Sequence, residues 1–146
     1  MIVRLMNKQD VAQVEEIEKQ NFSEPWSAQA FLDTIKQQNR FYFVVVEDEM
    51  VKGYCGMWNV AGEGQITHVA VDRRYRRSGV AKAMMTEMIE TGISNGITAF
   101  TLEVRVSNHP AIELYKSLGF EQAGIRRGFY DLPKEDAVIM WKHCQN

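Results

Sequence analysis

The stretch VAVDRRYRRSGVAKAMM, residues 69–85, indicates both a fold class and a ligand. An apolar strand is followed by a basic turn, by Gly79 and directly by a helix. A helix N-terminus offers unpaired N–H groups and a positive dipole end, and a neighbouring glycine lets a bulky anion approach the main chain. Arginine and lysine side chains add charge-assisted contacts to phosphate. The order predicts a diphosphate ligand, although an arbitrary basic loop is more often a solvated helix cap.

The charge distribution supports a small polyanion as the ligand. Seventeen Lys and Arg against nineteen Asp and Glu give a net charge of −2, which disfavours a nucleic-acid partner. Between positions 73 and 82 there is no acid, and the rest of the chain carries −7. The five basic residues of this turn are Arg73, Arg74, Arg76, Arg77 and Lys82. The turn is neither a P-loop nor a G-x-G-x-x-G loop, because it has only one glycine.

Outward from this turn, helices and strands alternate along the chain. A length of 146 residues suits one domain with its own core. Apolar periodicity predicts helices over 8–20, 28–37, 79–94 and 107–119, and strands over 2–5, 65–71, 98–106, 120–126 and 135–142. Two further strands within 41–60 are expected to meet at Glu47–Glu49. These elements predict one α/β domain over residues 1–146, with a mixed, mainly antiparallel central sheet flanked by helices.

Two motifs resemble the GCN5-related N-acetyltransferases. Arg76, Gly79 and Ala81 match the Arg-x-x-Gly-x-Ala form of that superfamily's acetyl-coenzyme A loop. LEVRVSNHPAIELYKSLGF, residues 102–120, resembles its second half, where an Asn and a Tyr precede Gly-Phe. SEPWSAQAF near the start and IRRGFYDLPKEDAVIM near the end are most similar to the ribosomal-protein-alanine N-acetyltransferases of this superfamily. The resemblance covers essentially the whole chain.

The resemblance implies a role for particular residues. The main chain of Val69, Ala70 and Val71 would pair with the pantetheine arm of acetyl-coenzyme A, and Asn108 would contact the cofactor near its reactive end. Glu103 corresponds to a general base and Tyr115 to a general acid. The pyrophosphate would be held at the turn, chiefly by backbone amides, through Arg76, Arg77, Ser78, Gly79, Val80, Ala81 and Lys82.

The residue types allow these roles and also simpler ones. Glu103 alternates with the apolar side chains of its strand and therefore faces away from the core, where it is either a cleft carboxylate or an exposed partner of a cation. Tyr115 falls on the apolar stripe of its helix, so a core tyrosine is the alternative to an acid with an ordinary pKa near 10. Asn108 follows Ser107 at a helix start and is also an ordinary cap.

Acceptor recognition is expected on two segments that match the flanks of the family's peptide cleft. These are Glu24–Ser27 and a loop over Arg126–Asp136. Their acids, Glu24, Asp131, Glu135 and Asp136, would favour a basic peptide, although each acid alone is more often solvated. Trp26 is more typical of a hydrophobic anchor, and Phe129–Tyr130 is a candidate wall of the cleft.

The resemblance predicts an enzyme that transfers acetyl from acetyl-coenzyme A to a protein N-terminus. The acceptor would be the N-terminal alanine of a small-subunit ribosomal protein, and the transfer would be direct, without a covalent enzyme intermediate. The alternatives are acetylation of a lysine side chain or small amine, and a non-catalytic module that binds coenzyme A.

The remaining expectations concern location, thiols and metals. No apolar run is long enough for a signal peptide or membrane span, so we expect a cytosolic protein with no membrane partner. Cys55 and Cys144 are expected to be reduced thiols and not nucleophiles. The three histidines are scattered and no C-x-x-C occurs, so no metal is expected.

Overall fold

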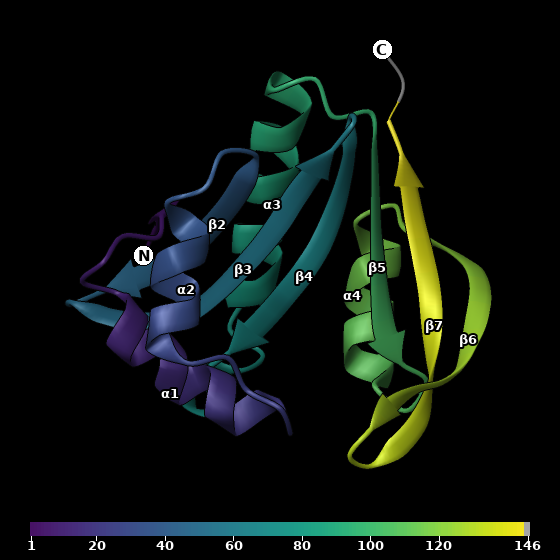
Figure 1. Cartoon of the computed structure of the whole chain (residues 1–146), viewed down its shortest axis with the longest axis horizontal. Coiled ribbons are helices and arrows are strands. Elements are labelled where there is room, and N and C mark those ends of the chain that lie inside the picture. Colours follow the sequence, from purple (N-terminus) through teal and green to yellow (C-terminus); the bar gives the residue numbers. More distant parts are fainter. Residues whose placement is uncertain (145–146) are drawn as a thin grey trace.

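The computed structural model describes residues 1–144, and its strands form one seven-stranded sheet in the order β1-β2-β3-β4-β5-β7-β6 (Figure 1). Every neighbouring pair is antiparallel except β4 and β5, which confirms the predicted mixed, mainly antiparallel sheet. Among these residues, no helix is both long and apolar enough to cross a membrane.

The elements are β1 (Ile2–Leu5), α1 (Val11–Asn21), α2 (Ala28–Ile35), β2 (Arg40–Glu47), β3 (Met50–Val60), β4 (Glu63–Val71), a 3₁₀ turn η1 (Arg73–Tyr75), α3 (Val80–Ser94), β5 (Ala99–Arg105), α4 (His109–Ser117), β6 (Glu121–Asp131) and β7 (Lys134–His143).

Two apolar clusters hold the helices against opposite faces of the sheet. On one face, α1 and α2 cover β2 to β4 through Val14, Ile17 and Phe31. On the other face, α3 covers the same strands with Met84, Met85 and Met88. Helix α4 belongs to this second cluster and packs beside β5 and β7 (Figure 1). The α1–α2 face of β5, β7 and β6 therefore stays without a helix among the described residues.

Strands β4 and β5 pair over a short length and then separate. Their ladder joins only Glu63–Gln65 to Ala99–Thr101, and beyond it the two strands diverge (Figure 1). A bulge in β4 lies at the point of separation, because the β3 register passes from Ile66 to His68 and leaves Thr67 unpaired. Bulges bend a strand and increase its twist. The bulge also places Ile66 in the α3 cluster and turns His68 toward the rings beneath α1 and α2.

The element boundaries differ most from the predictions at the start of α1 and between β6 and β7. Helix α1 begins at Val11 because Asp10 caps the preceding turn by accepting from the Asn7 N–H at 2.8 Å. Helix α3 ends at Ser94, as predicted, and includes Gly92, where a Cβ would crowd Met57 and Phe100, so this glycine serves close packing. The predicted loop over Arg126–Asp136 is wrong. These residues form the ends of β6 and β7, joined by a two-residue turn.

Gly56→Ala tests how closely β3 packs against β2. A Cβ at Gly56 would overlap the buried ring of Tyr42, so we expect a loss of about 1–3 kcal/mol in the free energy of unfolding, as is typical of overpacking. The measurement is equilibrium unfolding in urea. Gly124→Ala is the matched control, since its Cβ would lie 4.0 Å from the nearest atom. An equal loss in both variants would contradict the packing argument.

Candidate active site

The separation of β4 and β5 opens a cleft of about 920 Å³. Its lining includes Glu103, Tyr115, Asn108 and Val69, four of the predicted site residues. Glu103 reaches the cleft from the α1–α2 face of the sheet, because Leu102 and Val104 pack on the opposite face. Tyr115 belongs to the opposite apolar cluster, and the gap between the strands lets both side chains border one space.

Glu103 combines the two interpretations that the sequence left open. Its side chain is 31% exposed and lines the cleft, and its Oε1 lies 3.5 Å from Nη1 of Arg126 on β6. The side chain of Arg126 is 55% exposed, so water screens this pair and it contributes little to stability. The carboxylate of Glu103 is therefore accessible from the cleft, and a second cation could replace the Arg126 guanidinium beside it.

Tyr115 is a core residue with access to the cleft. The side chain is 6% exposed, and its ring packs edge-on to Phe120 with the centroids 6.0 Å apart. Burial raises the pKa of Tyr115 above the ordinary value expected from the sequence, and the nearby Tyr130 adds to the effect. The hydroxyl therefore stays protonated at neutral pH.

Asn108 acts as a helix cap and also borders the cleft. Its Oδ1 accepts from the Ala111 N–H at 3.3 Å, which confirms the capping interpretation for α4. Val69 is on β4 beyond the bulge, and Ala70 and Val71 continue the strand toward the basic turn. From Ile66 onward, the β4 edge that faces β5 has no strand partner among residues 1–144.

The basic turn has a backbone suited to an anion. Arg77 and Gly79 have φ values of +64° and +83°, and a Cβ at Gly79 would meet nothing within 4 Å. Gly79 is the N-cap of α3 and provides no side-chain cap, so the first N–H groups of the helix, those of Val80, Ala81 and Lys82, face outward without intrahelical acceptors.

The positive charge of the turn is smaller than the sequence suggested. Arg74 donates through Nε and Nη2 to Asp72, at 3.0 Å each, and is thereby partly neutralised. Arg76 donates to Asn21 Oδ1 at 2.9 Å, which ties the turn to the end of α1. The prediction counted only residues 73–82, so it omitted the acid immediately before them.

The two segments predicted to recognise the acceptor both line the cleft. Phe129 and Tyr130 both line the cleft, with ring centroids 5.0 Å apart, as expected of a wall, although they lie on β6 and not in a loop. Burial raises the pKa of Tyr130 to about 12, and the guanidinium of Arg105 lies 4.2 Å from its ring centroid. Across the cleft, Trp26 is both anchor and wall, because it packs on Phe31 and lines the space.

A buried polar cluster that was not predicted lies beside the cleft. Glu18, His68 and Tyr54 are 2%, 6% and 0% exposed, and Nε2 of His68 lies 3.5 Å from Oε2 of Glu18. Glu18 follows Val14 by four residues, so it falls on the buried stripe of α1, a signal that could have identified it. His68 was considered only as a metal ligand.

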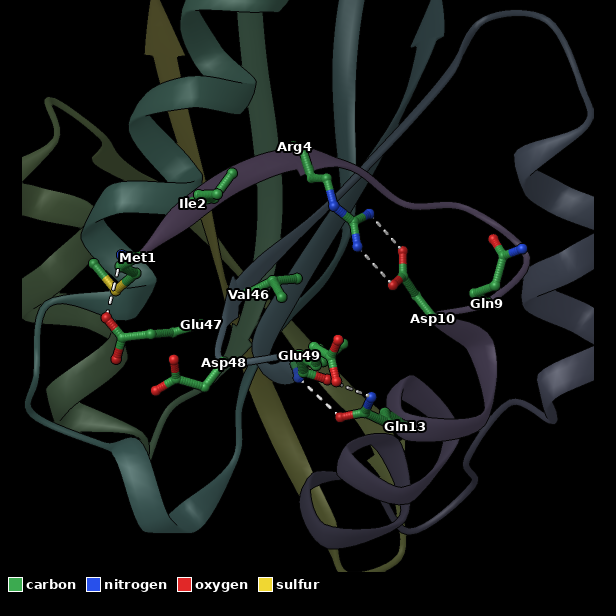
Figure 2. A pocket seen from close by; sticks show the side chains of 11 residues that line it. Met1, Ile2, Arg4, Gln9, Asp10, Gln13, Val46, Glu47, Asp48 and Glu49 are labelled. Carbon is green, nitrogen blue, oxygen red and sulfur yellow. Dashed lines mark hydrogen bonds and ion pairs between the residues drawn. The ribbon is translucent and has the colours of Figure 1, made fainter.

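A second cavity, of about 430 Å³, lies at the sheet edge beside β1 and the β2–β3 turn (Figure 2). Its polar groups pair with one another. Arg4 donates twice to Asp10, at 2.8 and 3.0 Å, and the Met1 ammonium lies 3.2 Å from Glu47. Gln13 bonds the main chain of Glu49 and Val51. Because these groups satisfy one another, the cleft between β4 and β5 is the better candidate active site.

Comparison with known proteins identifies the class. The model of the acetyltransferase (GNAT) family matches residues 11–120, and the chain belongs to this family. A protein of Escherichia coli (strain K12), named ribosomal protein bS18-alanine N-acetyltransferase, is 35% identical over 127 residues, which are 85% of this chain and 84% of that one. A Bacillus subtilis (strain 168) protein, to which the same name is given provisionally, is 37% identical over 140 residues, or 95% and 93% of the two chains.

The fold agrees with this assignment. The crystal structure of the Escherichia coli ribosomal-protein-S18-alanine N-acetyltransferase matches with a TM-score of 0.89 and 29% identity, over 99% of this chain and 94% of that one. The predicted membership of the GCN5-related N-acetyltransferases, the similarity to their ribosomal-protein-alanine branch and the enzyme class are all confirmed.

Asp72→Asn tests the carboxylate that shapes the basic turn. The hydrogen bond from Arg74 outweighs burial and lowers the pKa of Asp72 to about 2. A lowered pKa adds stability above about pH 4, and this contribution is lost as the pH falls through 2. We expect the free energy of unfolding of the variant to be about 1–2 kcal/mol lower than that of the unmodified protein at pH 7. This range is reduced because Arg74 is exposed and water screens the pair. The difference between the two proteins should become small near pH 2.

The measurement is chemical unfolding as a function of pH. Asp131→Asn, at an exposed aspartate, is the control and should follow the unmodified protein. A constant difference between pH 7 and pH 2 would contradict the assigned ion pair.

Proposed function

We propose that this protein transfers acetyl from acetyl-coenzyme A to the N-terminal alanine of a small-subunit ribosomal protein. The observation that carries the proposal is the meeting of Glu103 and Tyr115 at one cleft, where β4 and β5 separate. The Escherichia coli and Bacillus subtilis relatives are similar to this chain over most of its length. Their names support ribosomal protein bS18 as the acceptor.

The residues of β4 and the basic turn fit acetyl-coenzyme A as the second substrate. When bound, it supplies an activated acetyl thioester. The free edge of β4 at Val69–Val71 would pair with the pantetheine arm, because an unpaired strand edge presents N–H and C=O groups in ladder geometry. The amides of Arg77–Lys82, with the Arg76 side chain near them, would hold the pyrophosphate. Asn108 would lie near the reactive end.

Glu103 is the proposed general base. An α-amine has a pKa of about 7.7–8.0, so at neutral pH it is mostly an ammonium that must lose a proton before attack. The ammonium would take the place of the Arg126 guanidinium beside Glu103, and the carboxylate would accept its proton directly or through one water. The exchange of one cation for another leaves the carboxylate charge compensated throughout.

Tyr115 is the proposed general acid. The amine nitrogen bonds to the acetyl carbon, the carbon–sulfur bond breaks, and the Tyr115 hydroxyl donates its proton to the leaving thiolate. The nitrogen loses its second proton in this step, and that proton returns Tyr115 to its protonated form directly or through water. A backbone N–H near Val69 would stabilise negative charge on the thioester oxygen. Neither cysteine takes part, and burial raises the pKa of the Cys55 thiol, which keeps that thiol protonated.

Other expectations from the sequence remain part of this proposal. They are a single acetyltransferase domain over residues 1–146, a cytosolic location, the absence of a metal cofactor and the absence of nucleic-acid and membrane partners. Glu24, an acid that lines the cleft, would favour an acceptor that carries basic residues after its alanine.

The acceptor is tested with a panel of peptides in an acetyl-transfer assay. We expect transfer to the N-terminus of a peptide beginning with Ala and basic residues, at a kcat/KM about tenfold or more above that for the same peptide with a blocked N-terminus and an internal lysine. The products are located by mass spectrometry. Transfer to lysine or a small amine alone would contradict the proposed acceptor in favour of the alternative acetyltransferase activity.

Glu103→Gln and Tyr115→Phe test the chemistry. Each substitution removes proton transfer and keeps the side chain's size, so we expect kcat/KM to fall about 100-fold for Glu103→Gln and about 10- to 100-fold for Tyr115→Phe. Glu113→Gln, at an exposed glutamate of α4, is the control and should keep full activity. Unaltered rates in both site variants, with unchanged melting temperatures, would overturn the assigned mechanism.

A further inference from the structure

The buried cluster of Glu18, His68 and Tyr54 connects the segment between α1 and α2 to strands β3 and β4, on one side of the cleft. Glu18 accepts from the Tyr54 hydroxyl through Oε1 and from the Trp26 backbone N–H through Oε2, at 2.9 Å for the latter. Oε2 also lies 3.5 Å from Nε2 of His68. Strands β3 and β4 therefore contribute one donor each, and the segment between α1 and α2 contributes the third.

The carboxylate of Glu18 is ionised within this cluster. Burial alone would raise its pKa, yet the contacts with His68, Trp26 and Tyr54 outweigh burial and lower the pKa of Glu18. Removing one partner of a buried pair leaves an uncompensated charge, which is far more costly than breaking an exposed pair. The three donors are therefore held firmly in place around one side chain.

The other end of the cluster reaches the bulge of β4. Nδ1 of His68 lies 2.9 Å from Oγ1 of Thr67 and 3.3 Å from the Tyr42 hydroxyl. Thr67 is the unpaired residue of the bulge and lines the cleft. Both ring nitrogens of His68 are thus engaged, one with Glu18 and one with hydroxyls, so the imidazole orients its neighbours and has no nitrogen left for a substrate.

The aromatic contacts of His68 lead to the acceptor side. The ring of Trp26 lies edge-on to the imidazole of His68, with the ring centroids 4.4 Å apart. The ring of Phe22 also lies edge-on to this imidazole, with the centroids 6.2 Å apart. We call Phe22, Ser23, Glu24 and Trp26 the acceptor wall, because all four line the cleft opposite Phe129 and Tyr130. Two main-chain N–H groups of this wall donate to Glu18: that of Phe22 to the carbonyl oxygen at 3.0 Å, and that of Trp26 to the carboxylate at 2.9 Å.

We propose that the Glu18–His68 pair positions the acceptor wall against the β4 bulge and so sets the affinity for the amine acceptor. The inference rests on the proposed function, since it takes this cleft as the acceptor site. Glu18 and His68 are positioning residues, because they act through Trp26 and Thr67 and not on the reacting atoms. The basic turn lies beyond the far end of β4, so the affinity for acetyl-coenzyme A should depend on the pair less than the affinity for the acceptor does.

Glu18→Gln tests the proposal. The amide has one oxygen where the carboxylate has two, so the donors from Tyr54 and Trp26 cannot keep separate acceptors. We expect the acceptor KM to rise about tenfold, the acetyl-coenzyme A KM to change less than about twofold, and the Trp26 backbone N–H to exchange with deuterium about tenfold faster. Glu16→Gln, at a largely exposed glutamate of the same helix, is the control and should change none of the three.

A pair of His68 variants keeps the test decisive if Glu18→Gln does not fold. His68→Gln retains an N–H donor for Glu18 and is expected to keep the acceptor KM within about threefold, whereas His68→Ala removes the donor and should raise it about tenfold. Equal changes in the two KM values, or an unchanged acceptor KM in both Glu18→Gln and His68→Ala, would overturn the positioning role.

Hydrogen exchange separates this proposal from the proposed function. If the unmodified protein does not acetylate the alanine peptide, the proposed acceptor is wrong. The positioning role is then still tested by the rate at which the Trp26 backbone N–H exchanges with deuterium in the unmodified protein and in the variants. Faster exchange at residues 22–26, with unchanged exchange in α3, supports it. Unchanged exchange at Trp26 in Glu18→Gln and His68→Ala overturns it.

Discussion

The parallel ladder between β4 and β5 is short, and its early end shapes both the sheet and the cleft. Three residues of each strand pair, and then the strands separate in the middle of the sheet. Backbone N–H and C=O groups away from water need partners, so an open edge inside a sheet suits a strand-like ligand. The bulge at Thr67 bends β4 at this point and allows the two apolar clusters to stay closely packed on either side of the opening.

The separation determines which side chains can act together. In a continuous sheet, Glu103 and Tyr115 would lie on opposite faces with backbone between them, whereas here both border one cleft. The bulge also turns His68 toward α1, where the buried carboxylate of Glu18 lies 3.5 Å from its Nε2. The proposed base, the proposed acid and the positioning pair thus follow from one local irregularity in β4.

Much of this arrangement could be predicted from local patterns. The alternation in β5 correctly placed Glu103 opposite the apolar face, and the strand, basic turn, glycine and helix correctly predicted α3 starting after Gly79. Both C-terminal strands were predicted, but the first was expected to end at 126, because glycine, proline and several charges between Arg126 and Asp136 resemble a loop, while cross-strand pairing extends β6 to Asp131. The pairing of Arg74 with Asp72 and of Arg126 with Glu103 also depends on geometry that residue spacing does not contain.

The family, the order of the elements and the facing of Glu103 and Tyr115 follow from the amino-acid sequence. Periodicity indicates how a side chain faces relative to its own helix or strand, and motifs indicate local backbone shape, so both can be recognised without a fold. Which side chains meet depends on the tertiary structure: Glu103 with Arg126, Glu18 with His68 and Trp26, and Tyr115 with the cleft. The reason is that these contacts join residues far apart in the chain, and their positions depend on the bulge in β4 and its divergence from β5.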